Sequence, residues 1–254
     1  MDDVRLDRLL VERGLAPSRE RAQRLILAGS VLVDDRPVTK PGAAVPAEAR
    51  LRLRGAASPY VSRGGEKLAG ALDAFALDVA GRVALDVGAS TGGFTDCLLR
   101  RGARRVLAVD VGYGQLAWAL RQDARVTVLE RVNARRLAAA DLPETPDLAT
   151  IDVAFISLAL VLPAVAGVLA PGAPVVALVK PQFEVGRGEV GKGGVVRDPA
   201  LRAAAVEKVR AAAAAAGLAA QAEAESVLPG PKGNREVFLL LVKPLSRSPA
   251  GRCA

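Results

Sequence analysis

Residues 85–99 read LDVGASTGGFTDCLL, an apolar strand followed by a glycine-rich turn and the start of a helix. In doubly wound α/β domains such a turn lies at the carboxyl edge of a parallel sheet and binds a nucleotide-like ligand. The exposed N–H groups at the helix start attract the anionic part of that ligand. The stretch therefore predicts an α/β fold with a ligand site at this turn.

Short apolar runs recur on both sides of this stretch, with helix-compatible sequence between them. Apolar strands that alternate with helices predict a mostly parallel sheet covered on both faces. The expected strands are VALDVG at 83–88, VLAVDV at 106–111, VTVLE at 126–130, LATIDV at 148–153, PVVALVK at 174–180 and EVFLLLV at 236–242.

The first 60 residues follow a different pattern, in which two short helices precede short strands. The expected elements are helices at 5–14 and 18–29, the second with Ser18 as its N-cap, strands at 31–33 and 51–54, and a DDRP turn at 34–37.

The stretch GAASPYVSRGG at residues 55–65 is rich in small, turn-forming residues and indicates a linker between two domains. We therefore expect a small α+β domain at 1–60, an α/β domain at 61–246 and a tail at 247–254.

The composition excludes several kinds of chemistry. The 254 residues include no histidine, which rules out imidazole acid-base catalysis and histidine-bound metal, and we expect no metal site. Two cysteines, Cys97 and Cys253, cannot build a disulfide framework. The first residues lack the basic-then-apolar order of a signal peptide, so we expect a cytoplasmic protein. The formal charge of +8 is a weak indication of an anionic partner.

Residues 153–179 carry no charge and exceed the roughly 20 residues that cross a bilayer. Pro163, Pro171 and Pro174 interrupt this run, which favours a buried helix of about three turns and a strand. We expect no stable membrane association.

The side chains of the turn favour S-adenosylmethionine as the ligand. Ser90 occupies the position where a dinucleotide fingerprint needs its second glycine, which counts against NAD or FAD. A helix start at Thr91–Gly93 suits a methionine carboxylate, Asp86 its amino group and Asp110 the ribose hydroxyls. The alternative is a tight turn whose glycines serve only helix–sheet packing.

Four charged residues are expected near one rim of the sheet. Asp152 and Lys180 each follow an apolar strand, Glu236 precedes one, and Lys67 lies on an entry helix. Each alone could be a solvated strand cap. Their joint presence at the edge where α/β domains bind ligands indicates a catalytic site.

These residues resemble the Lys-Asp-Lys-Glu tetrad of ribose 2′-O-methyltransferases. The motifs ASTGGFTD, VDVGYGQLAW, FISL, LVKPQFEVG, GGVVRDP and LPGPKGN are similar to those of the TlyA family of ribosomal-RNA methyltransferases, also called hemolysin A. The likeness runs from Arg5 to about Val242, and the N-terminal part resembles the S-four RNA-binding domain. Lys232 departs from the family pattern without affecting Glu236.

The resemblance implies a Rossmann-like class I methyltransferase with a mostly parallel seven-stranded sheet, S-adenosylmethionine as cofactor and a small N-terminal S-four-type domain. The implied substrate is a ribose 2′-hydroxyl of ribosomal RNA within ribosomal subunits, with cytidine as the expected nucleotide. The implied cofactor contacts are Asp86, Gly88, Ser90, Thr91, Gly92, Gly93, Phe94, Asp110, Asn133 and Asp152.

For the catalytic step we expect Lys180 to accept the hydroxyl proton. Lys67 would disfavour the ammonium form of Lys180 by like-charge repulsion and steady the developing oxyanion. Asp152 and Glu236 would oppose this effect of Lys67 and orient the two ammonium groups. Alignment of the two reacting groups, worth as much as about 7 to 11 kcal/mol, should be the larger effect.

For RNA recognition we expect phosphate contacts from Arg5, Arg19, Arg21 and Lys40. Because aromatic residues make up 3% of the chain, base stacking should not dominate. The glycine-rich segment between Pro181 and Asp198 is either a lid that orders on ligand binding or a disordered surface insertion.

Three other functions are weighed from the sequence: a cytolysin acting on membranes, a non-catalytic RNA-binding protein, and a base-methylating enzyme. The third would need aromatic stacking or a cysteine nucleophile, and Cys97 lies inside the expected cofactor helix, where it is poorly placed for attack. The oligomeric state is left open.

Overall fold

The computed structural model describes residues 3–53, 58–230 and 232–245. Contacts within the chain divide it into two compact units, Met1–Pro59 and Tyr60–Ala254, which we call the small domain and the large domain. The predicted linker at 55–65 lies partly outside the described residues, and the predicted tail at 247–254 lies wholly outside them.

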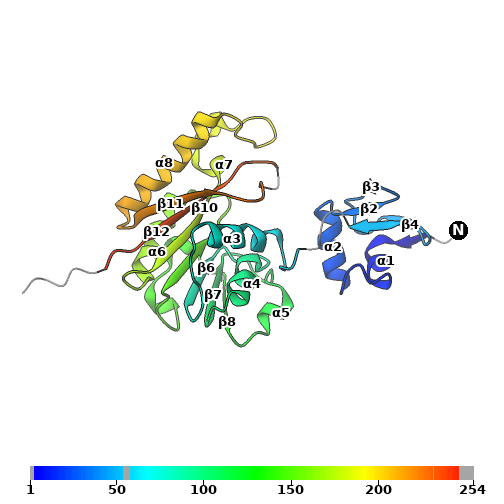
Figure 1. Ribbon diagram of the computed structural model, residues 1–254, viewed down its shortest axis with the longest axis horizontal. Helices are drawn as coiled ribbons and strands as arrows, with labels where there is room; N and C mark the ends of the chain where they lie inside the picture. Colours follow the sequence, from blue (N-terminus) through cyan, green and yellow to red (C-terminus); the bar gives the residue numbers. More distant parts are fainter. Residues whose placement is uncertain (1–2, 54–57, 231, 246–254) are drawn as a thin grey trace, which may run out of the picture. The chain divides into compact units, whose positions relative to one another are not determined.

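Two helices and five short strands are described in the small domain (Figure 1). Strands β3, β2 and β5 form an antiparallel sheet, and β1 pairs with β4. The elements are β1 (Asp3–Arg5), α1 (Leu6–Glu12), α2 (Arg19–Leu27), β2 (Val31–Val33), β3 (Arg36–Pro37), β4 (Ala44–Pro46) and β5 (Leu51–Leu53).

Apolar side chains on the inner faces of both helices form the core of this domain. Leu6, Leu10 and Ile26 are fully buried and pack with Val31 and Val45. The leucines whose helical spacing predicts these helices are therefore the residues that face the core.

The start of α2 and the turn between β2 and β3 follow the sequence predictions. Ser18 caps α2 by accepting a hydrogen bond from the backbone N–H of Arg21 at 3.2 Å. Asp34 and Asp35 have φ of 48° and 63°, as the two central residues of a type I′ hairpin do.

The sheet of the large domain has seven described strands in the order β11-β12-β10-β9-β6-β7-β8. The five strands from β10 to β8 run parallel, and β12 is antiparallel to both β10 and β11. The strands are β6 (Val83–Val87), β7 (Arg105–Asp110), β8 (Val126–Glu130), β9 (Leu148–Ile151), β10 (Pro174–Val179), β11 (Ala219–Glu225) and β12 (Val237–Val242). The predicted mostly parallel seven-stranded sheet is confirmed.

Helices cover both faces of this sheet (Figure 1). One core contains side chains of α3, α4 and α5, and the other contains those of α6 and α8. The α-helices are α3 (Arg63–Ala74), α4 (Gly93–Arg100), α5 (Trp118–Arg121), α6 (Leu162–Val168), α7 (Pro181–Glu184) and α8 (Pro199–Ala215). Short 3₁₀ turns are η1 (Ala134–Arg136), η2 (Ala139–Asp141), η3 (Leu158–Leu160) and η4 (Arg187–Glu189).

Strand β6 is the middle one of the five parallel strands, and the chain continues to opposite sides of it. Strands β7 and β8 follow on one side, whereas β9 and β10 lie on the other. Such a reversal of strand order opens a crevice at the carboxyl ends of the strands. The turn after β6 and the residue after β9 border this crevice.

The uncharged run at 153–179 folds as η3, α6 and β10, and both α6 and β10 are largely buried. Helix α6 has 7 residues, about two turns, and is shorter than predicted. Across residues 3–53, 58–230 and 232–245, no helix has the length and apolar character needed to cross a bilayer.

Candidate active site

The glycine-rich turn passes directly beneath the backbone of Asp152. Gly88 has φ of +87°, and a Cβ atom placed on it would lie 2.5 Å from the Asp152 carbonyl oxygen. A residue with a side chain would both strain this backbone conformation and collide with Asp152. Gly88 therefore allows the turn after β6 and the end of β9 to touch.

The following glycines bring α4 against α3. Gly92 has φ of +94° and caps α4, while a Cβ atom on Gly93 would collide with the Ser62 hydroxyl and lie 3.0 Å from the Gly65 backbone nitrogen. The ring of Phe94 packs on Gly64, the second residue of α3. This close contact fixes α3, which carries Lys67.

Lys180 and Asp152 form one ion pair of the site. The Lys180 Nζ lies 2.5 Å from the Asp152 Oδ1, and both side chains are largely shielded from solvent. This contact lacks the angles of a hydrogen bond, so among the described residues Asp152 Oδ1 has no hydrogen-bond donor. The oxygen is buried, and the Lys180 ammonium is the charged group in contact with it.

Lys67 and Glu236 form a second, more deeply buried ion pair. The Lys67 Nζ donates to Glu236 Oε2 at 2.5 Å, and Glu236 is 2% exposed. The carboxylate packs against Gly230, where a Cβ atom would collide with it. This pairing partly neutralises Lys67 and so weakens the like-charge repulsion of Lys180 that the sequence analysis expected.

Strand register brings the two ion pairs to the same rim. Val179 pairs with Val237 in the antiparallel β10–β12 ladder, so Lys180 and Glu236 occupy the next opposed positions. Residues opposed in this way have Cα atoms about 4.5 to 5.5 Å apart. Asp152 follows the last paired residue of the neighbouring strand β9. All four sequence-predicted catalytic residues therefore lie at one edge of the sheet.

A shallow hollow, open to solvent, lies beside the glycine-rich turn, between the ends of β7 and β8. Asp110 organises it, because its carboxylate accepts hydrogen bonds from the backbone N–H groups of Ser90 at 2.8 Å and Gly112 at 2.6 Å. The lining residues are Ala89, Ser90, Ala108, Asp110, Gly112, Gln115, Leu116, Val128 and Glu130. Within the described part of the chain, no group of three or more His, Cys, Asp or Glu side chains could hold a metal ion.

Asp86 lies beneath the turn and not on its open side. It is fully buried and accepts hydrogen bonds from the hydroxyls of Thr95 at 2.6 Å and Thr150 at 3.1 Å. Burial raises the pKa of its carboxyl to about 7. Because Asp86 is enclosed, it is not placed to bind the cofactor amino group as predicted from the sequence. Its carboxyl instead connects β6 to Thr95 of α4 and Thr150 of β9.

Three other predicted cofactor residues lie in different settings. The side chain of Phe94 is buried in the core, where its ring centroid lies 6.1 Å from that of Phe238. Its side chain is therefore turned away from the ligand side of the turn. Asn133 lies after β8, where its side chain accepts a hydrogen bond from the N–H of Arg135, and it does not line the hollow. Thr91 accepts a hydrogen bond from Ala117 through its carbonyl oxygen, which ties the turn to α5.

Two phenylalanines at this rim were not among the sequence predictions. Phe155 is 92% exposed and has φ of +64°, a strained conformation for a bulky residue. Its ring centroid lies 5.3 Å from that of Phe183. Each ring follows a tetrad residue by three positions, Asp152 and Lys180. An aromatic residue three positions after the charged residue that ends an apolar strand is the signal that could have revealed the pair.

Comparison with known proteins identifies the family. A model of FtsJ-like methyltransferases matches residues 60–243, and a model of the S4 domain matches residues 4–51. The chain is 54% identical over 239 residues to the 16S/23S rRNA (cytidine-2′-O)-methyltransferase TlyA of Mycobacterium tuberculosis, covering 94% of this chain and 89% of that protein. The chain belongs to the TlyA family of FtsJ-like methyltransferases.

Solved structures agree with this family assignment. A Streptococcus thermophilus protein that carries the word hemolysin in its name has a TM-score of 0.76 and 43% identity, with 98% of this chain and 93% of that chain covered. An S-adenosylmethionine-dependent methyltransferase from Mesorhizobium loti has a TM-score of 0.51 and 19% identity, with 68% of this chain and 96% of that chain covered. The second likeness shows the fold alone, and it is the predicted Rossmann-like methyltransferase fold.

In the S4 domain of this TlyA family member, two predicted RNA contacts are part of an internal network. Asp7 is fully buried and accepts hydrogen bonds from Arg5, Arg19 and Gln23 at 2.8–3.1 Å. The Arg5 guanidinium, the largest cause, holds the pKa of Asp7 well below its usual range. Arg5 and Arg19 remain about half exposed, so each keeps N–H groups that face solvent.

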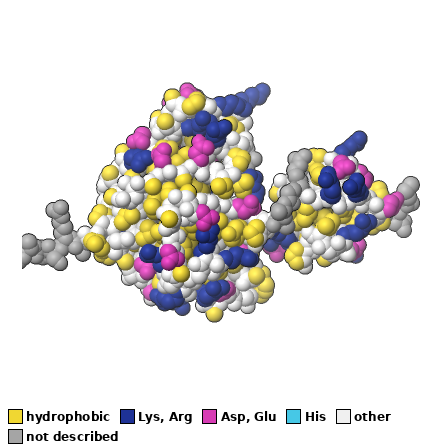
Figure 2. All heavy atoms as spheres, viewed as in Figure 1, with side chains coloured by type: hydrophobic (Ala, Val, Ile, Leu, Met, Phe, Trp, Pro, Cys, Tyr) yellow, Lys and Arg dark blue, Asp and Glu magenta, His cyan; other side chains and the backbone are white. Residues whose placement is uncertain are grey.

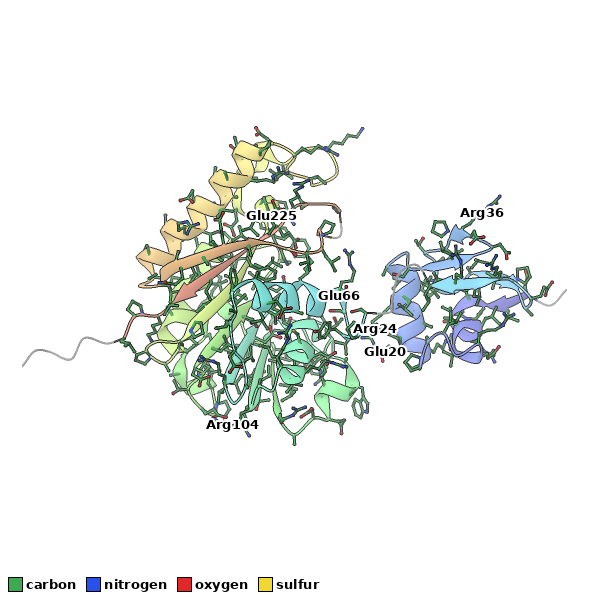
Figure 3. The ribbon with its side chains drawn as sticks, viewed as in Figure 1. Glu20, Arg24, Arg36, Glu66, Arg104 and Glu225 are labelled. Carbon is green, nitrogen blue, oxygen red and sulfur yellow. The ribbon has the colours of Figure 1, made fainter. Side chains whose placement is uncertain are left out.

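The other two predicted RNA contacts are less constrained by Asp7. Arg21 donates to the backbone oxygen of Ser58 at 3.0 Å, and Lys40 is exposed. Arg36, at the tip of the β2–β3 hairpin, projects into solvent (Figure 3). Figure 2 shows that Lys and Arg side chains gather on the visible face of the small domain.

The glycine-rich segment after Pro181 has regular contacts with its surroundings. It contains α7, η4 and an antiparallel bridge between Gly191 and Val195. Asn234 is buried and holds it at two points, by accepting from the Val196 N–H at 2.9 Å and donating to the Gly194 oxygen at 2.8 Å. This anchoring argues against a disordered insertion. Whether the segment acts as a lid stays a prediction.

Proposed function

We propose that this protein transfers a methyl group from S-adenosylmethionine to a ribose 2′-hydroxyl of ribosomal RNA, with cytidine as the nucleotide. The observation that carries the proposal is the contact of Gly88 with the backbone of Asp152. It joins the glycine-rich turn of a methyltransferase fold to one of the two Lys–carboxylate pairs at the same rim. The name of the Mycobacterium tuberculosis relative supports the same reaction.

The residues around the turn fit S-adenosylmethionine. The start of α4 offers backbone N–H groups to a carboxylate, and the hollow beside Asp110 has apolar walls from Ala89, Leu116 and Val128 with carboxylates at its edge. Asp110 accepts one backbone hydrogen bond at each carboxylate oxygen, and each oxygen keeps a lone pair that can accept from a ribose hydroxyl. When bound, the cofactor supplies a methyl group already activated by its sulfonium.

Lys180 is the proposed base. The ammonium of Lys180 must first lose a proton to solvent; its neutral Nζ would then take the proton of the 2′-hydroxyl. The hydroxyl oxygen would use the freed electron pair to form the new O–CH₃ bond in exchange for the methyl–sulfur bond. Asp152 holds Nζ at a fixed place, which is the alignment that such a reaction needs. Lys67, held by Glu236, offers positive charge to the developing oxyanion.

The RNA substrate is supported by features of both domains. The S4 domain presents arginines that suit phosphates, and phosphate contacts supply most of the affinity of such modules for folded RNA. At the rim, the exposed ring of Phe155 offers a surface on which a base can stack. A ribosomal-RNA substrate implies work on ribosomal subunits in the cytoplasm.

Cys97, the one cysteine among the described residues, is not suited to be the nucleophile of a base-methylating reaction. Cys97 lies on α4 with its side chain fully buried, and burial raises the pKa of its thiol to about 12. Such a thiol stays protonated and inaccessible.

Mapping of ribose methylation tests the proposal. Ribosomal RNA from a strain that lacks this protein should lose 2′-O-methylation at one or a few cytidines, and the purified protein with S-adenosylmethionine should restore it on isolated subunits. An unchanged ribose map, or restoration of a base methylation instead, would overturn the proposed function. Release of a fluorophore from liposomes by the purified protein, without cofactor, would favour the cytolysin.

A further inference from the structure

Glu184 joins the two segments that carry Asp152 and Lys180. It is the last residue of α7, four positions after Lys180, and is 2% exposed. Its carboxylate accepts hydrogen bonds from the Ser157 hydroxyl at 2.6 Å and from the Leu158 backbone N–H at 2.8 Å. Both donors belong to the segment that begins at Asp152.

Three successive contacts connect these segments. The first is the Asp152–Lys180 ion pair, the second is the contact between the rings of Phe155 and Phe183, and the third is the pair of hydrogen bonds to Glu184. The first two contacts lie at the rim, where at least one partner is partly exposed. The third lies beneath them, where water competes least.

Other contacts hold Glu184 itself in place. Lys208 of α8 donates to the Glu184 backbone oxygen at 2.5 Å, so α8 supports this end of α7. Burial is the largest cause that raises the pKa of the Glu184 carboxyl, and the two hydrogen bonds oppose this effect. Burial disfavours the charged form of this carboxyl, so its two hydrogen bonds to the Asp152 segment indicate a structural role for Glu184.

The segment that Glu184 holds is one that needs support. Phe155 has a φ of +64°, which strains the backbone of a bulky residue. Without the bonds to Ser157 and Leu158, relaxation of this strain would move the segment between Asp152 and Ser157.

We propose that Glu184 is a positioning residue for methyl transfer, which holds the Asp152 segment against the Lys180 segment and so keeps the tetrad aligned. The proposal rests on the proposed function. Glu184 does not touch the glycine-rich turn or the hollow, so its effect should fall on turnover and not on cofactor binding.

The test measures kcat for methyl transfer to ribosomal subunits and the Kd of S-adenosylmethionine for each variant. A misplacement of about 1 Å costs up to about 100-fold in rate, so Glu184→Ala should lower kcat by about that factor. The isosteric Glu184→Gln keeps one acceptor and should lose about tenfold. The Kd should change much less than kcat, because Glu184 is not among the residues that line the hollow beside the glycine-rich turn. Ser157→Ala combined with Glu184→Gln should cost less than the sum of the two single changes.

Glu189→Gln is the matched control. Glu189 lies in the same glycine-rich segment and accepts from the Gly186 N–H at 2.6 Å, but it has no bond to the Asp152 segment. Its kcat should equal that of the unchanged protein. A Glu184→Gln variant with normal kcat, or one whose kcat and cofactor affinity fall equally, would overturn the positioning role. If the unchanged protein transfers no methyl group, the proposed function itself fails and this inference falls with it.

Discussion

Gly88 and Gly81 have similar left-handed backbones, with φ of +87° and +74°, but different surroundings. A Cβ atom on Gly81 would meet nothing within 4 Å, whereas one on Gly88 would strike the backbone of Asp152. Alanine substitutions at the two positions therefore distinguish the effect of backbone strain alone from the effect of losing the contact between the turn and β9.

We predict that Gly88→Ala abolishes methyl transfer and weakens cofactor binding, because the turn must move away from Asp152. Gly81→Ala carries only backbone strain, of order 1–3 kcal/mol, and should keep its activity at temperatures where it is folded. Thermal unfolding, cofactor titration and methyl-transfer assays of both variants check this. Equal losses of activity in the two variants would show that the Asp152 contact is unimportant.

A buried carboxyl gives the large domain a dependence on pH. Asp86 has a pKa of about 7 in the folded chain, above its ordinary value of about 3.9. The folded state therefore binds the proton more tightly, and stability falls as pH rises from about 4 to 7 and then levels off. The slope from this group is about 1.4 kcal/mol per pH unit.

In Asp86→Asn this slope should be absent, because the amide cannot ionise and still has both threonine hydroxyls as partners. Denaturant unfolding of the large domain at pH 4, 5.5, 7 and 8 measures the difference between the two proteins. A difference that does not vary with pH would mean that Asp86 is ionised throughout.

The location of a residue at the rim of the sheet could be predicted from the sequence where the residue adjoins an apolar strand. Asp152, Lys180 and Glu236 each adjoin an apolar run, and the ends of neighbouring strands share one edge, so their convergence follows from the fold. Prediction from the sequence was less successful for Asp86 and Phe94, because whether a side chain in a turn faces ligand or core depends on the pleat and on the packing of α3.

At the scale of elements, strand β11 was missed for a physical reason. Its sequence AAQAEAE has poor strand propensity, and every second residue is exposed, as at Glu225 at its end (Figure 3). Pairing with the apolar strand β12 makes it a strand, and this long-range contact has no local signal. The helices of the small domain were predictable because leucine spacing and the Ser18 cap are local.

The glycine-rich segment between Pro181 and Asp198 provides a prediction at this scale. If it closes over bound ligands as a lid, then S-adenosylmethionine and ribosomal RNA together should slow its cleavage by trypsin, which has targets at Arg187, Lys192 and Arg197. Asn234→Ala removes the anchors of Val196 and Gly194 and should speed cleavage without ligand. Digestion followed by mass spectrometry measures both rates. A cleavage rate that neither ligand changes would rule out the lid.

At the scale of the whole molecule, a formal charge of +8 draws the chain toward RNA. Charge alone could not predict which arginines contribute, because Asp7 takes part of the hydrogen-bonding capacity of Arg5 and Arg19. The buried Asp7 had no sequence signal, since an aspartate in the first turn of a helix is ordinarily a surface residue.

We predict that the double variant Arg19→Ala, Arg21→Ala weakens binding to ribosomal RNA and lowers the slope of log affinity against log salt by about 1 to 2. The control is Arg104→Ala, Arg105→Ala, which removes two arginines that pair with Glu144 at the amino edge of the sheet. Filter binding at several salt concentrations compares the two. Equal slopes for both variants would show that RNA binding uses overall charge and not the S4 domain.

The most direct measurement compares cofactor binding and single-turnover methyl transfer in Lys180→Ala. Lys180 is beside Asp152 and not in the hollow, so the variant should bind S-adenosylmethionine with nearly unchanged affinity. Its methyl transfer to ribosomal subunits should fall by about 100-fold to 10,000-fold, the usual contribution of a general base together with its alignment. Near-normal transfer of tritiated methyl by Lys180→Ala would contradict the account.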